Sequence, residues 1–223
     1  HHQLENLNRF LLVTLQFRCL VGDVINGLDS MAVGSDRISQ IVLSLRNFSR
    51  LDESGIKAGD LHAGLESTLL LINNQLQQHQ LKSRVKIVKS YGDLPPVICD
   101  HSQLNQVFLN ILNNAVDAIQ SQLQSAQDKT KTAEIQIYTD TIESNQVEII
   151  IANTGEPIDP TIQEKIFDPF FTTKAIGQGS GLGLFVCYSV IEQHQGNIIA
   201  RSQTGGKTEF VITLQVRTSG KNT

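Results

Sequence analysis

The helical hydrophobic pattern of the first part of the chain breaks within residues 52–60. Before this break, leucines recur at three- and four-residue steps from Leu4 to Leu15, and a second apolar stripe runs from Leu28 to Phe48. Stripes of this period are typical of amphipathic helices. Turn-prone pairs of glycine with aspartate and asparagine separate the two stripes. The segment therefore predicts an antiparallel helical hairpin.

A lone hairpin cannot cover its own apolar stripes. Two hairpins from two chains would cover them in a four-helix bundle, which predicts a homodimer through the N-terminal helices. The alternative, in which both helices pack on the downstream part of the same chain, stays open.

Beyond residue 60, helical and alternating patterns follow one another, which indicates a mixed α and β domain. The predicted helices are Leu61–Gln78, Asp100–Ser121, Pro160–Ile166 and Leu184–Gln193. The predicted strands are Arg84–Ser90, Glu134–Ile142, Gln146–Asn153, Asn197–Ser202 and Thr208–Val216. We therefore divide the chain into a hairpin at residues 1–56, a mixed domain at 57–217 and a tail at 218–223.

The composition excludes several classes of protein. The 18 Lys and Arg against 22 Asp and Glu give a net charge of −4, which argues against a nucleic-acid partner. The three cysteines fit neither a disulfide framework nor a zinc site, and they favour a cytoplasmic setting. We expect no signal peptide, and no apolar run in this sequence reaches about 18 residues. Because it begins with His1, we expect a fragment, with a sensor domain or a membrane anchor upstream.

One predicted helix carries several asparagines among strongly apolar neighbours. Asn110 and Asn114 are four residues apart, so their side chains lie on one helix face. Asparagine is a mediocre helix former, and an amide oxygen is a suitable ligand for Mg²⁺ that keeps phosphate oxygens as further ligands. A solvated polar face is the alternative explanation.

Three further segments carry candidate chemistry. Ile151–Ile158 places a polar side chain and a glycine at a strand end, which suits contact with the edge of a nucleotide base. The sequence Asn-Thr-Gly is also a common turn. Gly177–Leu184 has four glycines at alternate positions before a helix, which suits phosphate binding or a flexible linker. Ile166–Lys174 contains phenylalanines that either anchor a lid or pack in the core. It also contains a lysine that suits phosphate binding.

In this order, the four segments resemble the ATP-binding domain of bacterial sensor histidine kinases, in the GHKL ATPase superfamily. Asn110–Asn114 resembles the N box, Asn153–Ile158 the G1 box, Ile166–Lys174 the F box and Gly177–Leu184 the G2 box. The resemblance covers about residues 60–217.

Two more segments extend the resemblance to the rest of the chain. Gly205–Phe210 is similar to the closing Gly-Thr-x-Phe pattern, and Arg37–Leu51 is similar to the second helix of the family's dimerisation hairpin. The implied fold class is α+β: an N-terminal antiparallel helical hairpin in a dimeric four-helix bundle, followed by an α/β sandwich of the GHKL type.

The resemblance also implies the site and its ligands, ATP and Mg²⁺. Asn110 would act in catalysis, and with Asn114 it would position Mg²⁺ and the phosphates, while Asn153 would face the adenine amino group. The residues expected to contact the nucleotide are Asn110, Asn114, Asp117, Asn153, Gly155, Ile158, Phe170, Thr173, Lys174, Gly177, Gly179, Ser180, Gly181, Leu182, Gly183 and Thr208.

The chain departs from the family pattern at two positions. Asn153 stands where the family usually has Asp, and Pro157 stands where it usually has a second Gly. An amide lacks the charge that strengthens a hydrogen bond to the adenine amino group. The alternative that the chain is a non-catalytic signalling module with an ATP-binding fold therefore stays open.

Hydrolytic ATPases of the superfamily use a Glu general base where this chain has Asn110, which favours phosphotransfer over hydrolysis.

The resemblance implies that the γ-phosphate passes to a histidine and then to an aspartate in the receiver domain of a response regulator. His2 begins the first helical stripe and is the candidate phosphoacceptor. Gln3 and Leu7 differ from the family's acidic residue and proline at the matching positions. The alternative is that His1 and His2 are the remnant of a purification tag.

Overall fold

The computed structural model describes residues 31, 55–128, 130–143, 145–175, 179–202 and 206–216. The chain divides into two compact units, one of residues 1–46 with 173–180 and one of residues 47–172 with 181–223. The second unit contains all the strands and helices named below. The predicted N-terminal hairpin, its dimer contacts and His2 lie outside the described residues.

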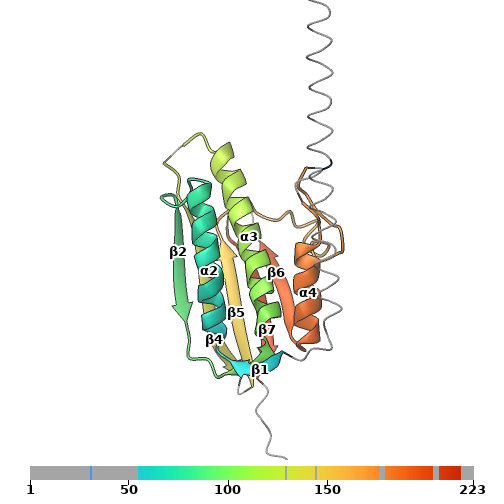
Figure 1. Cartoon of the computed structure of the whole chain (residues 1–223). Helices are drawn as coiled ribbons and strands as arrows, with labels where there is room; N and C mark the ends of the chain where they lie inside the picture. The colour runs from blue at the N-terminus through green and yellow to red at the C-terminus, as the bar shows by residue number, and fades with distance from the viewer. Residues whose placement is uncertain are drawn as a thin grey trace, which may run out of the picture. The chain divides into compact units, whose positions relative to one another are not determined.

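A five-stranded mixed sheet forms one layer of the second unit (Figure 1). Its strand order is β2-β4-β5-β7-β6, in which β2 and β4 are parallel and every other neighbouring pair is antiparallel. The strands are β2 (Val85–Tyr91), β4 (Ala133–Glu143), β5 (Gln146–Asn153), β6 (Asn197–Ser202) and β7 (Thr208–Gln215).

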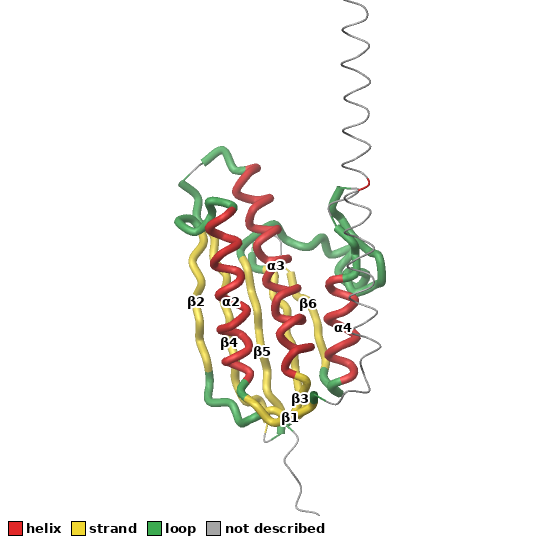
Figure 2. The backbone as a smooth tube through the Cα atoms, viewed as in Figure 1, coloured by secondary structure: helices red, strands yellow, loops and turns green. Residues whose placement is uncertain are grey.

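Three helices cover one face of this sheet (Figure 2). They are α2 (Leu61–Gln78), α3 (His101–Ser125) and α4 (Gly183–Gln193). The central helix is α3, which packs against both α2 and α4. Its Phe108, Ile111 and Ile119 are fully buried in the same core as Ile149 and Ile151 of β5. This α/β sandwich, which the family resemblance implies, fixes α3 firmly because close-packed interiors resist displacement.

The end of α4 is tied to the start of α3. Asp100 caps α3 by accepting hydrogen bonds from the backbone N–H groups of Ser102 (3.0 Å) and Gln103 (3.1 Å). The backbone N–H of Asp100 donates to Nε2 of His194, the C-cap residue of α4, at 3.0 Å. Nδ1 of His194 therefore carries the hydrogen, and it donates to the Val190 carbonyl at 2.7 Å.

Most predicted elements agree with the structure. The differences are the end of the central helix and one additional small sheet. Predicted helix Leu61–Gln78 has the same bounds in the structure, whereas the central helix ends at Ser125 rather than at Ser121. A small sheet of β1 (Ile56–Gly59) and β3 (Val97–Asp100) is not predicted. Each of these strands has only four residues, too few for an alternating pattern to be recognised.

The predicted short helix Pro160–Ile166 is wrong, because this segment forms successive turns. Their backbone hydrogen bonds join residues three apart, from the Ile162 N–H to the Asp159 carbonyl, from Lys165 to Ile162 and from Asp168 to Lys165. Ile166 is the only buried residue between residues 160 and 166. A segment this short, without an apolar stripe to bury, gains too little from packing to complete a helix.

Within the described residues, every helix is too short or too polar to cross a membrane.

Candidate functional site

The candidate site is built on one face of α3. Asn110, Asn114 and Ala118 follow one another at four-residue steps, so they form a row along the helix. At 1.5 Å per residue, the row is about 12 Å long. All three residues are partly exposed, beside the stripe of α3 that faces the core. Asp117 lies on the same side of the helix.

The Asn110 end of this row holds the start of α4. The side-chain amide of Asn110 donates from Nδ2 to the Gly183 carbonyl at 3.2 Å, and Gly183 is the first residue of α4. The N-cap residue, Leu182, provides no side-chain hydrogen bond to the helix. An uncapped helix start has N–H groups and a positive dipole end that attract anions.

The Ala118 end of the row holds the loop that follows β5. The backbone N–H of Glu156 donates to the Ala118 carbonyl at 3.0 Å. A Cβ atom on Gly155 would lie 2.6 Å from the backbone of Ala118 and of Ile119, so only glycine fits against the helix here. The loop and the helix are therefore in direct backbone contact, which places the candidate base-binding segment beside α3.

Asn153 ends β5 next to this loop and is 2% exposed. Its Oδ1 accepts a hydrogen bond from the Gly155 N–H at 2.9 Å. Thr208 of β7 is paired with Asn153 across the sheet and is also buried. Two of the predicted residues thus lie side by side, although they are 55 positions apart in the sequence.

Ser202 belongs to the same cluster, and the sequence analysis does not identify it. Its hydroxyl accepts a hydrogen bond from the Ile158 N–H at 3.0 Å and lies 2.8 Å from the Thr208 hydroxyl. Ser202 and Thr208 are register partners on β6 and β7. Only the pairing of β6 with β7 identifies Ser202 as part of this cluster, because nothing in the local sequence around Ser202 distinguishes it.

The predicted lid segment meets the start of α4 at Gly181. Phe170 is 66% exposed and has a left-handed backbone with φ of 65°. Gly181 has φ of 67°, and a Cβ atom there would lie 2.3 Å from the Phe170 carbonyl carbon. Glycine is therefore required at Gly181 for both its conformation and its close approach to Phe170.

The other predicted lid residues are placed differently. Thr173, Lys174, Gly179 and Ser180 belong to the first compact unit, and Gly177 lies outside the described residues. The structure of the second unit therefore brings together Asn110, Asn114, Asp117, Asn153, Gly155, Ile158, Phe170, Gly181, Leu182, Gly183 and Thr208, either through α3 itself or through the contacts described above.

The donor set beside Asn110 suits a hard cation held partly by phosphate. Among the described residues, no three His, Cys, Asp or Glu side chains gather in a way that could hold a metal ion. Burial raises the pKa of the neighbouring Cys187 thiol to about 12, despite a hydrogen bond with Asn110 that lowers it, so this thiol is protonated at neutral pH. Because Nδ2 of Asn110 donates to the Gly183 carbonyl, its amide oxygen is the group left to contact a cation.

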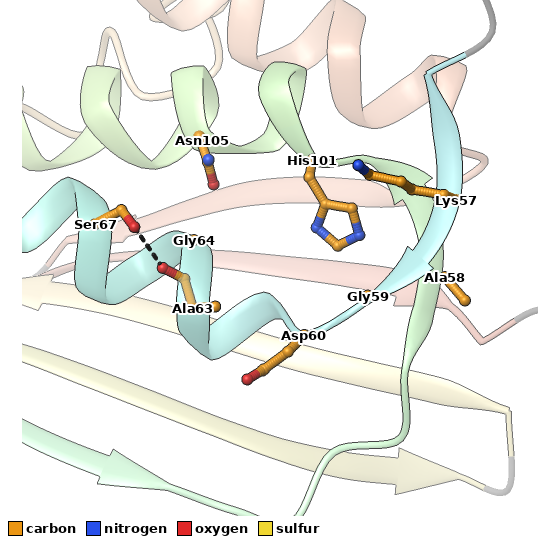
Figure 3. A pocket seen from close by; sticks show the side chains of 9 residues that line it. All are labelled: Lys57, Ala58, Gly59, Asp60, Ala63, Gly64, Ser67, His101 and Asn105. Carbon is orange, nitrogen blue, oxygen red and sulfur yellow. Dashed lines mark hydrogen bonds between the residues drawn. The ribbon is translucent and has the colours of Figure 1, made fainter.

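A separate pocket of about 320 Å³ lies where α2 and α3 begin, beside β1 (Figure 3). The ring of His101 covers Gly59, and the amide of Asn105 covers Gly64. Lys57 also lines this pocket, but none of the predicted nucleotide-binding residues does. The pocket is therefore distinct from the face of α3 that carries Asn110 and Asn114.

Comparisons with known proteins agree with this arrangement. Residues 99–218 match the family described as histidine kinase-, DNA gyrase B- and HSP90-like ATPases. The chain is 38% identical over 189 residues to the signal transduction histidine-protein kinase AtoS of Escherichia coli (strain K12), covering 84% of this chain and 28% of AtoS. The chain thus spans little more than a quarter of that relative's length.

Two solved structures have a similar fold. Full-length ShkA in complex with AMPPNP matches with a TM-score of 0.65 at 20% identity, covering 84% of this chain and 38% of ShkA. The histidine kinase ThkA in complex with the response regulator TrrA matches with a TM-score of 0.58 at 20% identity, covering 82% of this chain and 49% of ThkA.

The chain therefore belongs to the family of histidine kinase-, DNA gyrase B- and HSP90-like ATPases. Within it, the relatives place the chain with the bacterial sensor histidine kinases. They do not favour the non-catalytic module or the hydrolytic ATPase that the sequence leaves open.

Replacing Gly155 with alanine should separate the loop from α3. The added Cβ would overlap the backbone of Ala118 and Ile119, so we expect a loss of about 1–3 kcal/mol in the free energy of unfolding. Urea denaturation measures this loss, and hydrogen exchange at the Glu156 amide should become faster. Gly183→Ala is the matched control, because its Cβ would meet only the Asn110 side chain at 3.9 Å. Equal stability of the two variants would contradict the packing argument.

Proposed function

We propose that this chain binds ATP with Mg²⁺ along the α3 row of Asn110, Asn114 and Ala118. One observation carries the proposal: the start of α4 and the loop after β5 are both hydrogen-bonded to this row, at opposite ends. A nucleotide has a polar base edge at one end and a polyanion at the other. A row about 12 Å long with a helix start at one end and a strand-end amide at the other suits such a ligand.

The phosphates would lie at the Asn110 end, near the start of α4. The amide oxygens of Asn110 and Asn114 would hold Mg²⁺, which in turn would neutralise phosphate charge. The family resemblance supports phosphate contacts for Thr173, Lys174, Gly177, Gly179, Ser180, Gly181, Leu182 and Gly183. The close approach of Phe170 to Gly181 would support the last of these segments.

The base would lie at the other end of the row. Asn153 would face its Watson–Crick edge, with Gly155, Ile158 and Thr208 around it and Asp117 on the neighbouring turn of α3. Thr208 and Ile158 support this assignment because the Ser202 hydroxyl links both of them beside Asn153.

We further propose that the bound ATP phosphorylates a histidine. An imidazole nitrogen would attack the γ-phosphorus, forming an N–P bond while the bond to the bridging β–γ oxygen breaks and ADP leaves. Asn110 cannot accept a proton from water, which favours this transfer over hydrolysis. The phosphoryl group would then pass to an aspartate in a response-regulator receiver domain. The likeness to AtoS supports this proposal, as do the AMPPNP in the ShkA complex and the response regulator TrrA in the ThkA complex.

The remaining parts of the chain would serve this transfer. We propose that residues 1–56 form the dimerisation and phosphotransfer hairpin, with His2 as acceptor, that residues 57–217 form the ATP-binding domain, and that residues 218–223 are a tail. The whole protein would carry a sensor domain upstream, and this part of it would work in the cytoplasm.

Asn114→Ala should weaken the binding of Mg-ATP at least tenfold, because it removes a ligand to the metal in the middle of the row. A hydrogen bond or ligand contact to a charged group is worth about 1.5–3 kcal/mol, which corresponds to about ten- to a hundredfold in affinity. Titration calorimetry measures the change. Asn74→Ala, an exposed asparagine on α2, is the control and should bind as the parent does. Parent-like affinity of Asn114→Ala would refute the assignment of the metal site.

Incubation of the chain with γ-labelled ATP should transfer the label to His2. The product would be a phosphoramidate, which is labile in acid and stable in base, and His2→Gln should remove the label. Label retained in this variant would show that another histidine is the acceptor. Absence of label from both proteins, despite ATP binding, would contradict His2 as the acceptor and would mean that the chain holds a nucleotide-binding domain without a working acceptor histidine.

A further inference from the structure

The orientation of the Asn153 side chain is fixed by its neighbour. The Gly155 N–H is a donor, so the atom 2.9 Å from it must be the amide oxygen of Asn153 and not the amide nitrogen. Gly155 is held against α3, because the N–H of the next residue, Glu156, donates to the Ala118 carbonyl. The NH₂ group of Asn153 is therefore the edge that remains for a ligand.

This NH₂ group has no hydrogen-bond partner in the part of the chain that the structure describes. Asn153 as a whole is 2% exposed, yet its side-chain nitrogen keeps a small contact with solvent. The group thus opens onto the small accessible area that the residue retains. The neighbouring hydroxyl of Thr208 is engaged with Ser202 and makes no hydrogen bond to it.

A buried donor that lacks a partner selects ligands that offer an acceptor. A carboxylate in the place of Asn153 could accept the Gly155 N–H with one oxygen and present the other to the 6-amino group of adenine. The amide instead presents a donor. Adenine offers it the N1 acceptor, and a 6-oxopurine, such as hypoxanthine or guanine, offers it the O6 acceptor.

We propose that Asn153 makes this site accept 6-oxopurine nucleotides, such as ITP and GTP, alongside ATP. The inference rests on the proposed function, because it requires that Asn153 faces the base of a bound nucleotide. A site that hydrogen-bonds a ligand group rejects the analogue that lacks or reverses this group, because buried polar atoms then stay unpaired. The carboxylate would reject O6 through repulsion between two acceptors, and the amide does not.

The test compares Mg-ATP with Mg-ITP on the full chain, by titration calorimetry, for the parent and for Asn153→Asp. Hypoxanthine differs from adenine at the edge in question and lacks the extra 2-amino group of guanine. The parent should bind the two nucleotides within about threefold of each other. Asn153→Asp should tighten the binding of ATP and weaken the binding of ITP. The dissociation constant of ITP divided by that of ATP should rise at least tenfold. Asn74→Asp, which adds the same charge on an exposed position of α2, should leave the ratio unchanged.

A second arm needs no variant and covers the case in which Asn153→Asp does not fold. The triphosphate of 1-deazaadenosine keeps the 6-amino group but has a C–H group in place of N1, so it offers the Asn153 amide no acceptor, and the parent should bind it several-fold more weakly than ATP or ITP. Binding of ATP with strong rejection of ITP by the parent, or a ratio that Asn153→Asp raises less than tenfold, would overturn the inference while leaving nucleotide binding intact. If neither ATP nor ITP binds to the parent, the proposed function itself fails, and the inference fails with it.

Discussion

The burial of one side of α3 is the interaction on which the rest of the structure depends. Phe108, Ile111 and Ile119 are removed from water by the sheet, and α2 and α4 pack along either side of the same helix. Such close packing leaves α3 little freedom to move. Its polar row of Asn110, Asn114 and Ala118 is consequently a fixed base on which two less regular segments are positioned.

Each of these segments is attached to α3 by a backbone group rather than by a side-chain pair alone. The Gly183 carbonyl accepts from Asn110, and the Glu156 N–H donates to the Ala118 carbonyl. At the far ends of the helices, His194 accepts from the Asp100 N–H and holds α4 beside α3. These contacts bring a helix start and a strand end to opposite ends of one row, which is the arrangement that the proposed nucleotide site requires.

The sequence predicts the parts of this arrangement that depend on local periodicity. The stripe of α2 gives the bounds Leu61–Gln78 correctly, and the four-residue spacing of Asn110 and Asn114 predicts their shared face. The sheet β1–β3 and the role of Ser202 depend on pairing between distant segments, which no local pattern encodes. The turns at residues 160–166 are mistaken for a helix because their composition permits one while their exposure leaves nothing to stabilise it. The orientation of the Asn153 amide likewise follows only from the position of Gly155.

The central claim is that a nucleotide lies along the α3 row, with its base at Asn153 and its phosphates at the start of α4. A crystal structure of the chain with Mg-AMPPNP tests it most directly. The account predicts the purine edge within hydrogen-bond distance of the Asn153 amide and a magnesium ion bound by the amide oxygens of Asn110 or Asn114. A nucleotide lying in the reverse direction, or bound in the pocket beside Lys57 and His101 instead, would contradict it.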